Sequence, residues 1–190
     1  MSSRDKILLA IKENKPVSTA LPVVDTSCVI AFEDLATQFK NVLGTIGGVA
    51  VEVASKEDMH LLVEKELSGV TNAINTLGAY DERLQTMSAA ELASTDLAVI
   101  AGTLAVAENG AIWVNEQQMV NRILPFIAQQ LIIVVEKNSI VPTMHHAYGA
   151  INVAETGFGA FIAGPSKTAD IEQSLVIGAH GPAGLKVILY

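Results

Sequence analysis

The 190-residue sequence has little charge and few aromatic side chains. Only 17% of its residues are charged and 5% are aromatic, although 50% are hydrophobic, whereas a typical soluble domain is about 25% charged. Its longest largely apolar stretch near the middle, residues 97–107, is well short of the roughly 18 residues that a spanning helix needs. The apolar run 7–11 lies between Arg4, Lys6 and Lys12, and no small-residue cleavage site follows it. We therefore expect a cytoplasmic protein without a membrane span.

Basic residues and cysteine are also scarce. The net charge is −8 and the twelve Lys and Arg residues form no cluster, which argues against nucleic acid as a partner. The single Cys28 excludes an internal disulfide and a cysteine-ligated iron–sulfur cluster, which needs four thiolates. We interpret Cys28 as a buried small hydrophobe. The adjacent His145 and His146 lack the spacing of zinc or iron ligands, so we expect no metal site.

The apolar runs predict an α/β fold. A sheet that is covered on both faces gives wholly apolar strands, which would account for the low charge; a sizeable apolar face that a partner covers is the alternative, which the sequence leaves open. Strands and helices alternate along the chain, so we expect a layered α/β protein with a largely parallel sheet flanked by helices. We expect one domain over residues 1–190, with a helix and loop at 1–25 appended to its core. The expected strands are 47–53, 70–74, 97–101, 104–107, 111–114, 131–135, 159–163 and 186–190. The expected helices are 3–13, 33–43, one that starts after Ser55, 116–123 and one within 140–151.

The first candidate site is the turn 164–170. Gly164, Ser166, Lys167, Thr168 and Asp170 follow a predicted strand, and a helix is expected to begin near residue 169 or 170. Free backbone N–H groups, two hydroxyls, a cation and a helix dipole would together hold an anion. The turn is not a P-loop, because a proline stands where lysine must follow the second glycine. The alternative is that one hydroxyl only caps the helix.

The second candidate site is the apolar hairpin with Gly102, Thr103 and Glu108. A partly buried Glu108 would have a raised pKa and could act as a base or nucleophile, or it could be a plain turn residue. Arg122 is a candidate for holding a substrate carboxylate, with a surface arginine as the alternative. His180 lies in a glycine-rich turn, where a catalytic or ligand-binding role competes with a structural one.

The C-terminal third carries a resemblance to a known family. The runs Gly-Pro-Ser-Lys-Thr-Ala-Asp-Ile-Glu (164–172) and Gly-Ala-His-Gly-Pro (178–182), followed by Leu-Lys-Val-Ile-Leu (185–189), resemble the LUD (lactate-utilisation) domain family. They look closest to its protein C branch. Upstream, Ala-Glu-Asn-Gly (107–110), Arg122 and Ile-Val-Pro (140–142) support the resemblance. The similarity is clear over about residues 95–190.

The resemblance implies both a fold and a role. The fold would be similar to that of the sugar-phosphate isomerase and CoA-transferase-like proteins. The role would be in a three-component system that oxidises L-lactate to pyruvate, whose other subunits carry the iron–sulfur clusters. By position, Glu108 matches the family glutamate. The C-terminal signature is matched by Gly164, Ser166, Thr168, Asp170, Glu172, His180 and Gly181. The sequence departs from the family at Asn109 and Ala111, which replace threonines, at Lys167, where arginine is common, and at Ala183, a place that is often basic.

Three hypotheses for function follow. The leading one is a non-redox subunit of a lactate-oxidising complex, with no cofactor of its own. It would hold a small carboxylate or phosphate, or a partner surface, at the turn 164–170, with Glu108 and His180 facing that turn. The alternative is a stand-alone isomerase or CoA-transferase-like enzyme that acts on a phosphorylated or acyl small molecule. A third is an assembly subunit without a ligand. The sequence leaves a homo-oligomer open.

Overall fold

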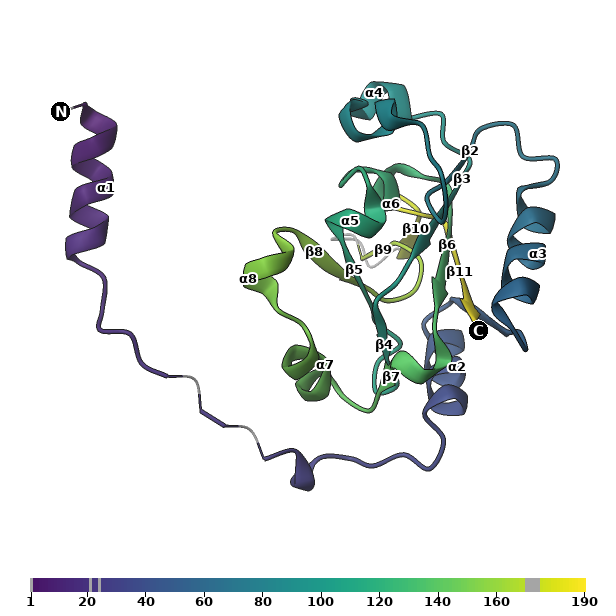
Figure 1. The fold of residues 1–190 in the computed structure, drawn as a ribbon, viewed down its shortest axis with the longest axis horizontal. Helices are drawn as coiled ribbons and strands as arrows, with labels where there is room; N and C mark the ends of the chain where they lie inside the picture. Colours follow the sequence, from purple (N-terminus) through teal and green to yellow (C-terminus); the bar gives the residue numbers. More distant parts are fainter. Residues whose placement is uncertain (1, 21, 24, 170–174) are drawn as a thin grey trace.

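The computed structural model describes residues 2–20, 22, 23, 25–169 and 175–190 of the chain (Figure 1). Its core is a five-stranded parallel sheet in the order β1-β11-β6-β3-β2, which confirms the predicted α/β class. The strands of this sheet are β1 (Val49–Glu52), β2 (Ala73–Asn75), β3 (Leu97–Ala101), β6 (Gln130–Val135) and β11 (Gly184–Leu189). The longest pairing joins β11 to β6, with Leu185 opposite Leu131 and Leu189 opposite Val135.

Both faces of the parallel sheet are covered, as its apolar strands predicted. Alternate side chains of β6 point to opposite faces. Ile132 and Val134 pack with the buried residues of α3 (Lys56–Leu67), while Ile133 and Val135 pack with α2 (Leu35–Thr45) and with a second sheet. Ser55 caps α3 through its hydroxyl, as expected. The low charge of the chain therefore reflects a doubly buried sheet.

The second sheet has four strands in the order β7-β4-β5-β8. They are β4 (Leu104–Val106), β5 (Ile112–Asn115), β7 (Ile140–Val141) and β8 (Gly159–Ile162). The β4–β5 hairpin forms around Asn109-Gly110 as predicted, and Gly110 adopts the positive φ of 71° that this turn requires. One face of this sheet meets the core, and the other meets α7 (Met144–Ala150). On that face the ring centroids of Trp113 and Phe161 lie 4.8 Å apart, with the rings tilted by 53°.

Two local predictions were wrong. The expected helix 116–123 is two short helices, α5 (Glu116–Met119) and α6 (Leu124–Ile127), because Val120 takes a φ of 61° that ends the first. Pro125 lies in the first turn of α6, where its missing N–H costs nothing. The expected helix near residue 169 is absent from the described residues there. β9 (Lys167–Ala169) instead pairs antiparallel with β10 (Leu175–Ile177).

The N-terminal helix α1 (Ser3–Glu13) stands apart from the sheets, at the end of an extended arm (Figure 1). Ser2 and Asp5 form a capping box at its start, but the helix buries no residue. Cys28 follows in η1 (Thr26–Cys28) and is exposed. The expectation of a buried Cys28 was wrong, because the arm has no core around it.

Four further elements complete the chain. They are η2 (Glu82–Thr86), α4 (Ala89–Leu92), η3 (Lys137–Ser139) and α8 (Val153–Thr156). The described part of the chain contains no helix that is both long and apolar enough to cross a membrane.

Candidate functional site

The two turns predicted to carry chemistry meet at the C-terminal end of α2. A Cβ atom placed on Gly164 would lie 2.9 Å from the carbonyl oxygen of Ile46, and one on Gly110 would lie 3.2 Å from Ile46 Cδ1. Gly164 also has a positive φ of 74°, which L side chains rarely adopt. Ile46 therefore brings together the hairpin turn and the turn that follows β8, although about 50 residues separate them in the sequence.

Backbone hydrogen bonds connect the turn at Gly164 to residues 178–183, which we name the His180 loop. The backbone N–H of Ser166 donates to the carbonyl of Pro182 at 2.9 Å, and Gly178 N–H donates to the carbonyl of Ser166 at 3.0 Å. The site of a Cβ on Gly181 is 3.2 Å from Ser166 Cβ. His180 and Ser166, both predicted site residues, thus belong to one structural unit.

His180 lines a hollow of about 380 Å³, which we name the His180 hollow. Its wall is formed by Ile123, Phe126, Ile127, Gln129 and residues 178–181. The ring of His180, the amide of Gln129 and nearby backbone groups supply hydrogen-bonding capacity beside an apolar wall. A small polar molecule with an apolar end matches this combination of surfaces.

This unit lies at the amino edge of the parallel sheet. Residues 178–183 lead into β11, Gln129 leads into β6, and the carbonyl of Gln129 accepts the N–H of Ala183 at 2.8 Å. The sequence argument had placed the turn 164–170 by the rule that ligands bind beyond the carboxyl ends of parallel strands. That placement was wrong, because β8, which precedes the turn, belongs to the second sheet.

The remaining residues of this turn lie in the β9–β10 hairpin. The site of a Cβ on Gly47 is 3.5 Å from Lys167 Nζ, so the Lys167 side chain lies over the start of β1. Thr168 pairs with Val176 across the hairpin. Asp170 and Glu172 lie outside the described residues. A helix dipole cannot act at Lys167 and Thr168, since both are in a strand.

Glu108 is exposed and serves as a cap for α7. One of its carboxylate oxygens, Oε2, accepts the backbone N–H of Met144 at 2.9 Å, which satisfies an orphan donor at the start of that helix. The expected partial burial of Glu108 was therefore wrong. Thr143, the residue before the helix, makes no capping hydrogen bond with its side chain and contacts His146 instead.

Gly102 and Thr103 lie at the carboxyl end of β3. Gly102 N–H donates to the carbonyl of Val134 at 2.8 Å, and a Cβ at Gly102 would come within 2.5 Å of Ile112 Cγ2. Thr103 Oγ1 donates to Gln118 Oε1 at 3.0 Å. Both residues thus make contacts within the fold, on the sheet edge opposite to the His180 hollow.

Arg122 is held by an ion pair. Its Nε and Nη2 donate to one oxygen of Glu116 at 2.8 and 2.5 Å, and its guanidinium lies 5.2 Å from the centroid of the Phe158 ring. The side chain is 61% exposed. Next to it, buried Asn121 donates to the carbonyls of Leu84 and Met87 at 2.8 and 2.9 Å.

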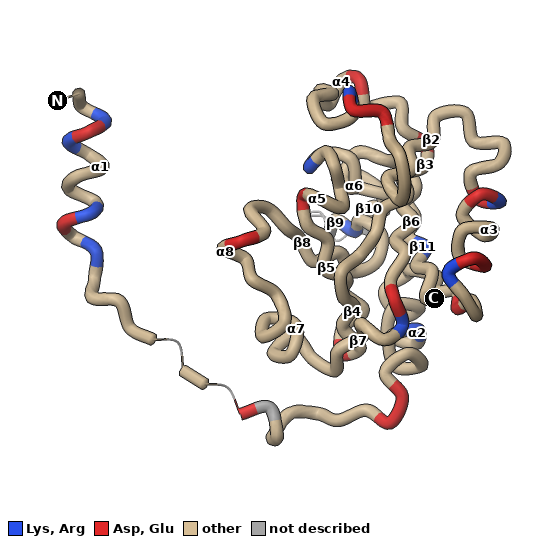
Figure 2. The backbone as a smooth tube through the Cα atoms, viewed as in Figure 1, with Lys and Arg blue, Asp and Glu red and all other residues tan. Residues whose placement is uncertain are grey.

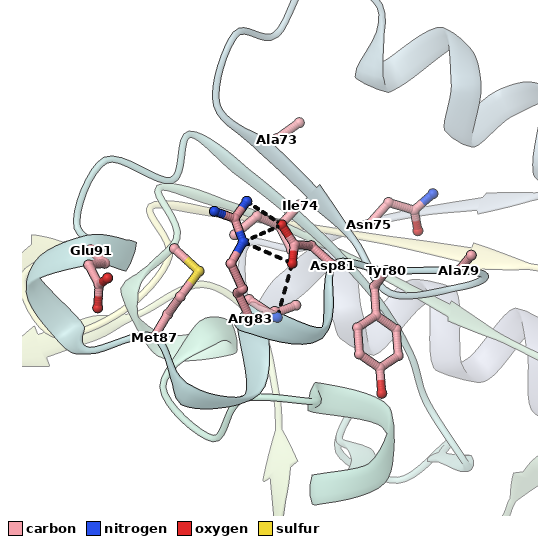
Figure 3. Close-up of a pocket in the computed structure, with 10 residues that line it drawn as sticks. Ala73, Ile74, Asn75, Ala79, Tyr80, Asp81, Arg83, Met87 and Glu91 are labelled. Atoms are coloured by element: carbon pink, nitrogen blue, oxygen red, sulfur yellow. Dashed lines mark hydrogen bonds and ion pairs between the residues drawn. The ribbon is translucent and has the colours of Figure 1, made fainter.

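Sequence reasoning missed one hollow altogether. It has a volume of about 430 Å³ beside β2, and we name it the Asp81 hollow (Figure 3). The residues that line it are Ala73, Ile74, Asn75, Ala79, Tyr80, Asp81, Arg83, Leu84, Met87 and Glu91. No run of these residues forms a recognisable motif, because they come from a strand, a loop, η2 and α4.

The charged residues in the lining of the Asp81 hollow are two carboxylates and one guanidinium, which pairs with one of them. Hydrogen bonds from the Arg83 guanidinium, at 2.5 to 3.1 Å, hold the pKa of Asp81 below its ordinary value. The backbone N–H and hydroxyl of Ser88 similarly lower the pKa of Glu91. Both carboxylates therefore stay ionised to a lower pH than an ordinary Asp or Glu does.

A cluster of three charged side chains lies at the carboxyl edge of the parallel sheet. Glu52, at the end of β1, binds Lys40 at 2.7 Å and also pairs with Lys137. Hydrogen bonds from Lys137 and then Lys40 lower the pKa of Glu52. Within the described residues, no group of three or more His, Cys, Asp or Glu side chains is placed to hold a metal ion.

The parallel sheet, with a second sheet packed on it, defines a mixed α/β domain. A structure of a DUF162 family protein from Deinococcus radiodurans has a similar fold, with a TM-score of 0.63 and 21% identity, over 82% of this chain and 95% of that one. The family model of the LUD domain matches residues 71–190. This chain belongs to the LUD domain family, as the resemblance implied.

Two relatives carry the name lactate utilization protein C. The protein from Geobacillus thermodenitrificans (strain NG80-2) is 30% identical over 192 aligned positions, which cover 95% of this chain and 76% of that protein. The protein from Bacillus pumilus (strain SAFR-032) is 35% identical over 116 residues, which cover 58% of this chain and 48% of that protein. This chain therefore spans about half of one relative and three quarters of the other.

Proposed function

We propose that this chain is a component of a multi-protein system that oxidises L-lactate to pyruvate, and that it holds a small carboxylate in the His180 hollow. One observation carries the proposal. In a chain that is similar along 95% of its length to a lactate utilization protein C, the backbone joins Ser166 and His180 beside a hollow with one apolar wall. A hydroxy acid such as lactate has a carboxylate and a methyl group, which suit the polar and apolar sides of this hollow.

Binding in this site would rest on charge-assisted hydrogen bonds. The His180 ring and the amide of Gln129 can both donate to a carboxylate, and hydrogen bonds to an ionised acceptor are about twice as strong as neutral ones. Phe126 is 41% exposed and would cover the methyl group. Glu108 has no part in this proposal, because its carboxylate caps α7.

The redox centre would lie on other subunits. Oxidation of lactate to pyruvate releases two electrons and two protons, and an iron–sulfur cluster that accepts electrons needs four thiolate ligands. Such a cluster does not fit these 190 residues, which contain one cysteine. Partner subunits that carry the clusters are therefore part of the proposal, and this chain would bind and orient the carboxylate.

A thermal-shift titration tests the site directly. L-lactate and pyruvate should raise the melting temperature of the full chain, and His180→Ala should weaken the effect at least about tenfold, since a lost charge-assisted bond is worth about 1.5–3 kcal/mol. His60→Ala is the matched control, because His60 is exposed on α3 and does not line the hollow. A response to sugar phosphates or CoA esters that Ser166→Ala abolishes would instead favour the isomerase or acyl-transfer alternative.

A growth experiment tests the role. A strain that lacks this chain should fail to grow on L-lactate, and expression of the unaltered chain should restore growth. The chain should also copurify with iron–sulfur proteins. Normal growth on lactate without the chain would refute the role, and the absence of any ligand response would leave only an assembly function.

A further inference from the structure

The N-terminal arm exposes an unusual amount of apolar surface. Of the sixteen large apolar side chains that are exposed in the described part of the chain, seven belong to residues 1–33. They are Ile7, Leu8, Leu9, Ile11, Val17, Val23 and Ile30. Helix α1 has eleven residues and buries none of them, and isolated helices of this length are marginal in water. The helix therefore needs a surface to pack on.

The exposed face of α1 has a defined chemistry. Ile7, Leu8 and Ile11 recur at helical spacing and form one stripe, and the side chains of Arg4 and Lys12 lie beside it. Leu9 points to the other side of the helix. The stripe matches an apolar groove that has acidic residues at its rim.

The charge of the arm is opposite to that of the rest of the chain. Residues 1–15 contain four basic and two acidic side chains, a net charge of +2, whereas the whole chain carries −8. Residues 16–190 therefore carry −10. Figure 2 shows blue and red segments of the backbone alternating along α1, and red segments with a short blue one beside them around α4. Electrostatic attraction will therefore favour contact between residues 1–15 and the acidic surface formed by residues 16–190 of the same or another copy of the chain.

The Asp81 hollow offers a surface on which the apolar stripe of α1 can pack. Ile74, Leu84 and Met87 line it together with Asp81, Glu91 and Arg83, so its charged lining residues are two acidic and one basic, with Arg83 paired to Asp81. The His180 hollow, by contrast, has no acidic residue in its lining. Amphipathic helices bind in grooves of this type through residues at i, i+3 and i+4 spacing.

The segment that follows α1 directs this helix away from the two sheets of its own chain. No glycine occurs before Gly44, and Pro16 and Pro22 favour an extended backbone. The described residues between 15 and 25 form neither helix nor strand, and the arm runs outward in Figure 1. An extended stretch of some 20 residues reaches roughly 65 Å, so a neighbouring molecule is within range.

From these features we propose that α1 of one copy packs its Ile7, Leu8 and Ile11 stripe into the Asp81 hollow of a second copy. The exchange is reciprocal and gives a two-fold dimer. Arg4 and Lys12 lie near Asp81 and Glu91 of the neighbouring molecule. This proposal is independent of the proposed function, because it uses neither the His180 hollow nor a small ligand.

Light scattering after size exclusion, over a range of protein concentrations, tests the dimer. The unaltered full chain should be a dimer at micromolar concentration. The double variant Leu8→Glu/Ile11→Glu should raise the dissociation constant at least about tenfold, because burial of these side chains drives the contact. The matched control Leu9→Glu should stay within about twofold. A chain that is monomeric at every concentration, or a dimer that tolerates the double variant, would overturn the proposal.

The receptor side is tested separately. Ala79→Arg places a long cation in the hollow and should weaken the dimer, whereas Ala90→Arg on α4, which does not line the hollow, should not. Both positions are exposed, so the fold should survive, and circular dichroism checks this. Equal behaviour of the two variants would show that the hollow is not the receptor.

Disulfide cross-linking shows whether α1 packs in the Asp81 hollow of a second copy or in that of its own chain. In a Cys28→Ser background, chains with Ile11→Cys are mixed with chains with Ala79→Cys and oxidised. Covalent dimers that appear only in the mixture would support the exchange. A chain with both cysteines that closes an internal disulfide and stays a monomer would show that α1 folds back on its own body, which would refute the proposal.

Discussion

Gly102 offers a sharp test of packing at the junction of the two sheets. In Gly102→Ala the new Cβ would lie 2.5 Å from Ile112 Cγ2, 2.9 Å from Val135 Cγ2 and 3.1 Å from Ile133 Cγ2. These three neighbours are completely buried, so none can move into solvent. The backbone of Gly102 cannot retreat either, because its N–H donates to the carbonyl of Val134 at 2.8 Å.

The expected cost of Gly102→Ala follows from this crowding. Overpacking of a tight core lowers the free energy of unfolding by about 1–3 kcal/mol. Alanine also reduces the chain entropy of the unfolded state, which offsets this loss by about 0.4–1 kcal/mol. The net loss should be about 1–2 kcal/mol, and a chain of this size loses roughly 2–4 °C in melting temperature for each kcal/mol. Urea unfolding and a thermal scan measure both quantities.

Gly149→Ala is the matched control for Gly102→Ala. Gly149 lies in α7, where a Cβ would meet nothing within 4 Å, so alanine should stabilise the helix by about 0.5–1 kcal/mol. The two substitutions are chemically identical and should have opposite signs. If Gly102→Ala were as stable as the original chain, the argument from crowding would be refuted, and the glycine would need an explanation other than packing.

Three further outcomes are expected. Asn121→Ala should cost about 2–4 kcal/mol in urea unfolding, because it removes the donors to two carbonyl groups in the interior; a loss below about 1 kcal/mol would contradict this role. Gly164→Ala should cost about 1–3 kcal/mol, since φ is +74° and the carbonyl of Ile46 is 2.9 Å from the new atom, and thermal unfolding that matches the original chain would disprove it. Glu52→Gln should cost less than about 1 kcal/mol at pH 7. The pKa of Glu52 is lowered in the folded chain, so its stabilising effect is complete above the unfolded pKa and is lost as the pH falls through the folded one. Urea unfolding at pH 7 and at a series of lower pH values should show the difference between the two chains shrinking toward zero in acid.

Local signals in the sequence were enough for most of the fold. The unbroken apolar run of β6 predicted a strand buried on both faces, and both faces are covered. Asn109-Gly110 predicted the β4–β5 hairpin. Ser55 predicted the start of α3. In each case the physical cause lies within a few residues, namely hydrophobic burial, a turn with positive φ or a helix cap.

The errors occurred where distant residues decide the structure. The sequence Ser-Lys-Thr-Ala at 166–169 is as typical of a helix start as of a strand, and pairing with β10 selects the strand. The break at Val120 has no glycine or proline to mark it. It is held by Asn121, whose partners Leu84 and Met87 lie more than 30 residues away. The convergence of Gly110 and Gly164 on Ile46 likewise has no local signal.

The position of each candidate along the strands limits what a small ligand can contact. Thr103 follows the carboxyl end of β3, whereas His180 precedes β11 at the amino edge of the same sheet. A strand of five residues is about 16 Å long, which exceeds the length of a three-carbon acid several-fold. One such molecule cannot contact Thr103 and His180 together. Ser166, by contrast, is joined to the His180 loop by two backbone hydrogen bonds, so it lies at the same edge of the sheet as His180, while the hydroxyl of Thr103 is already bonded to Gln118.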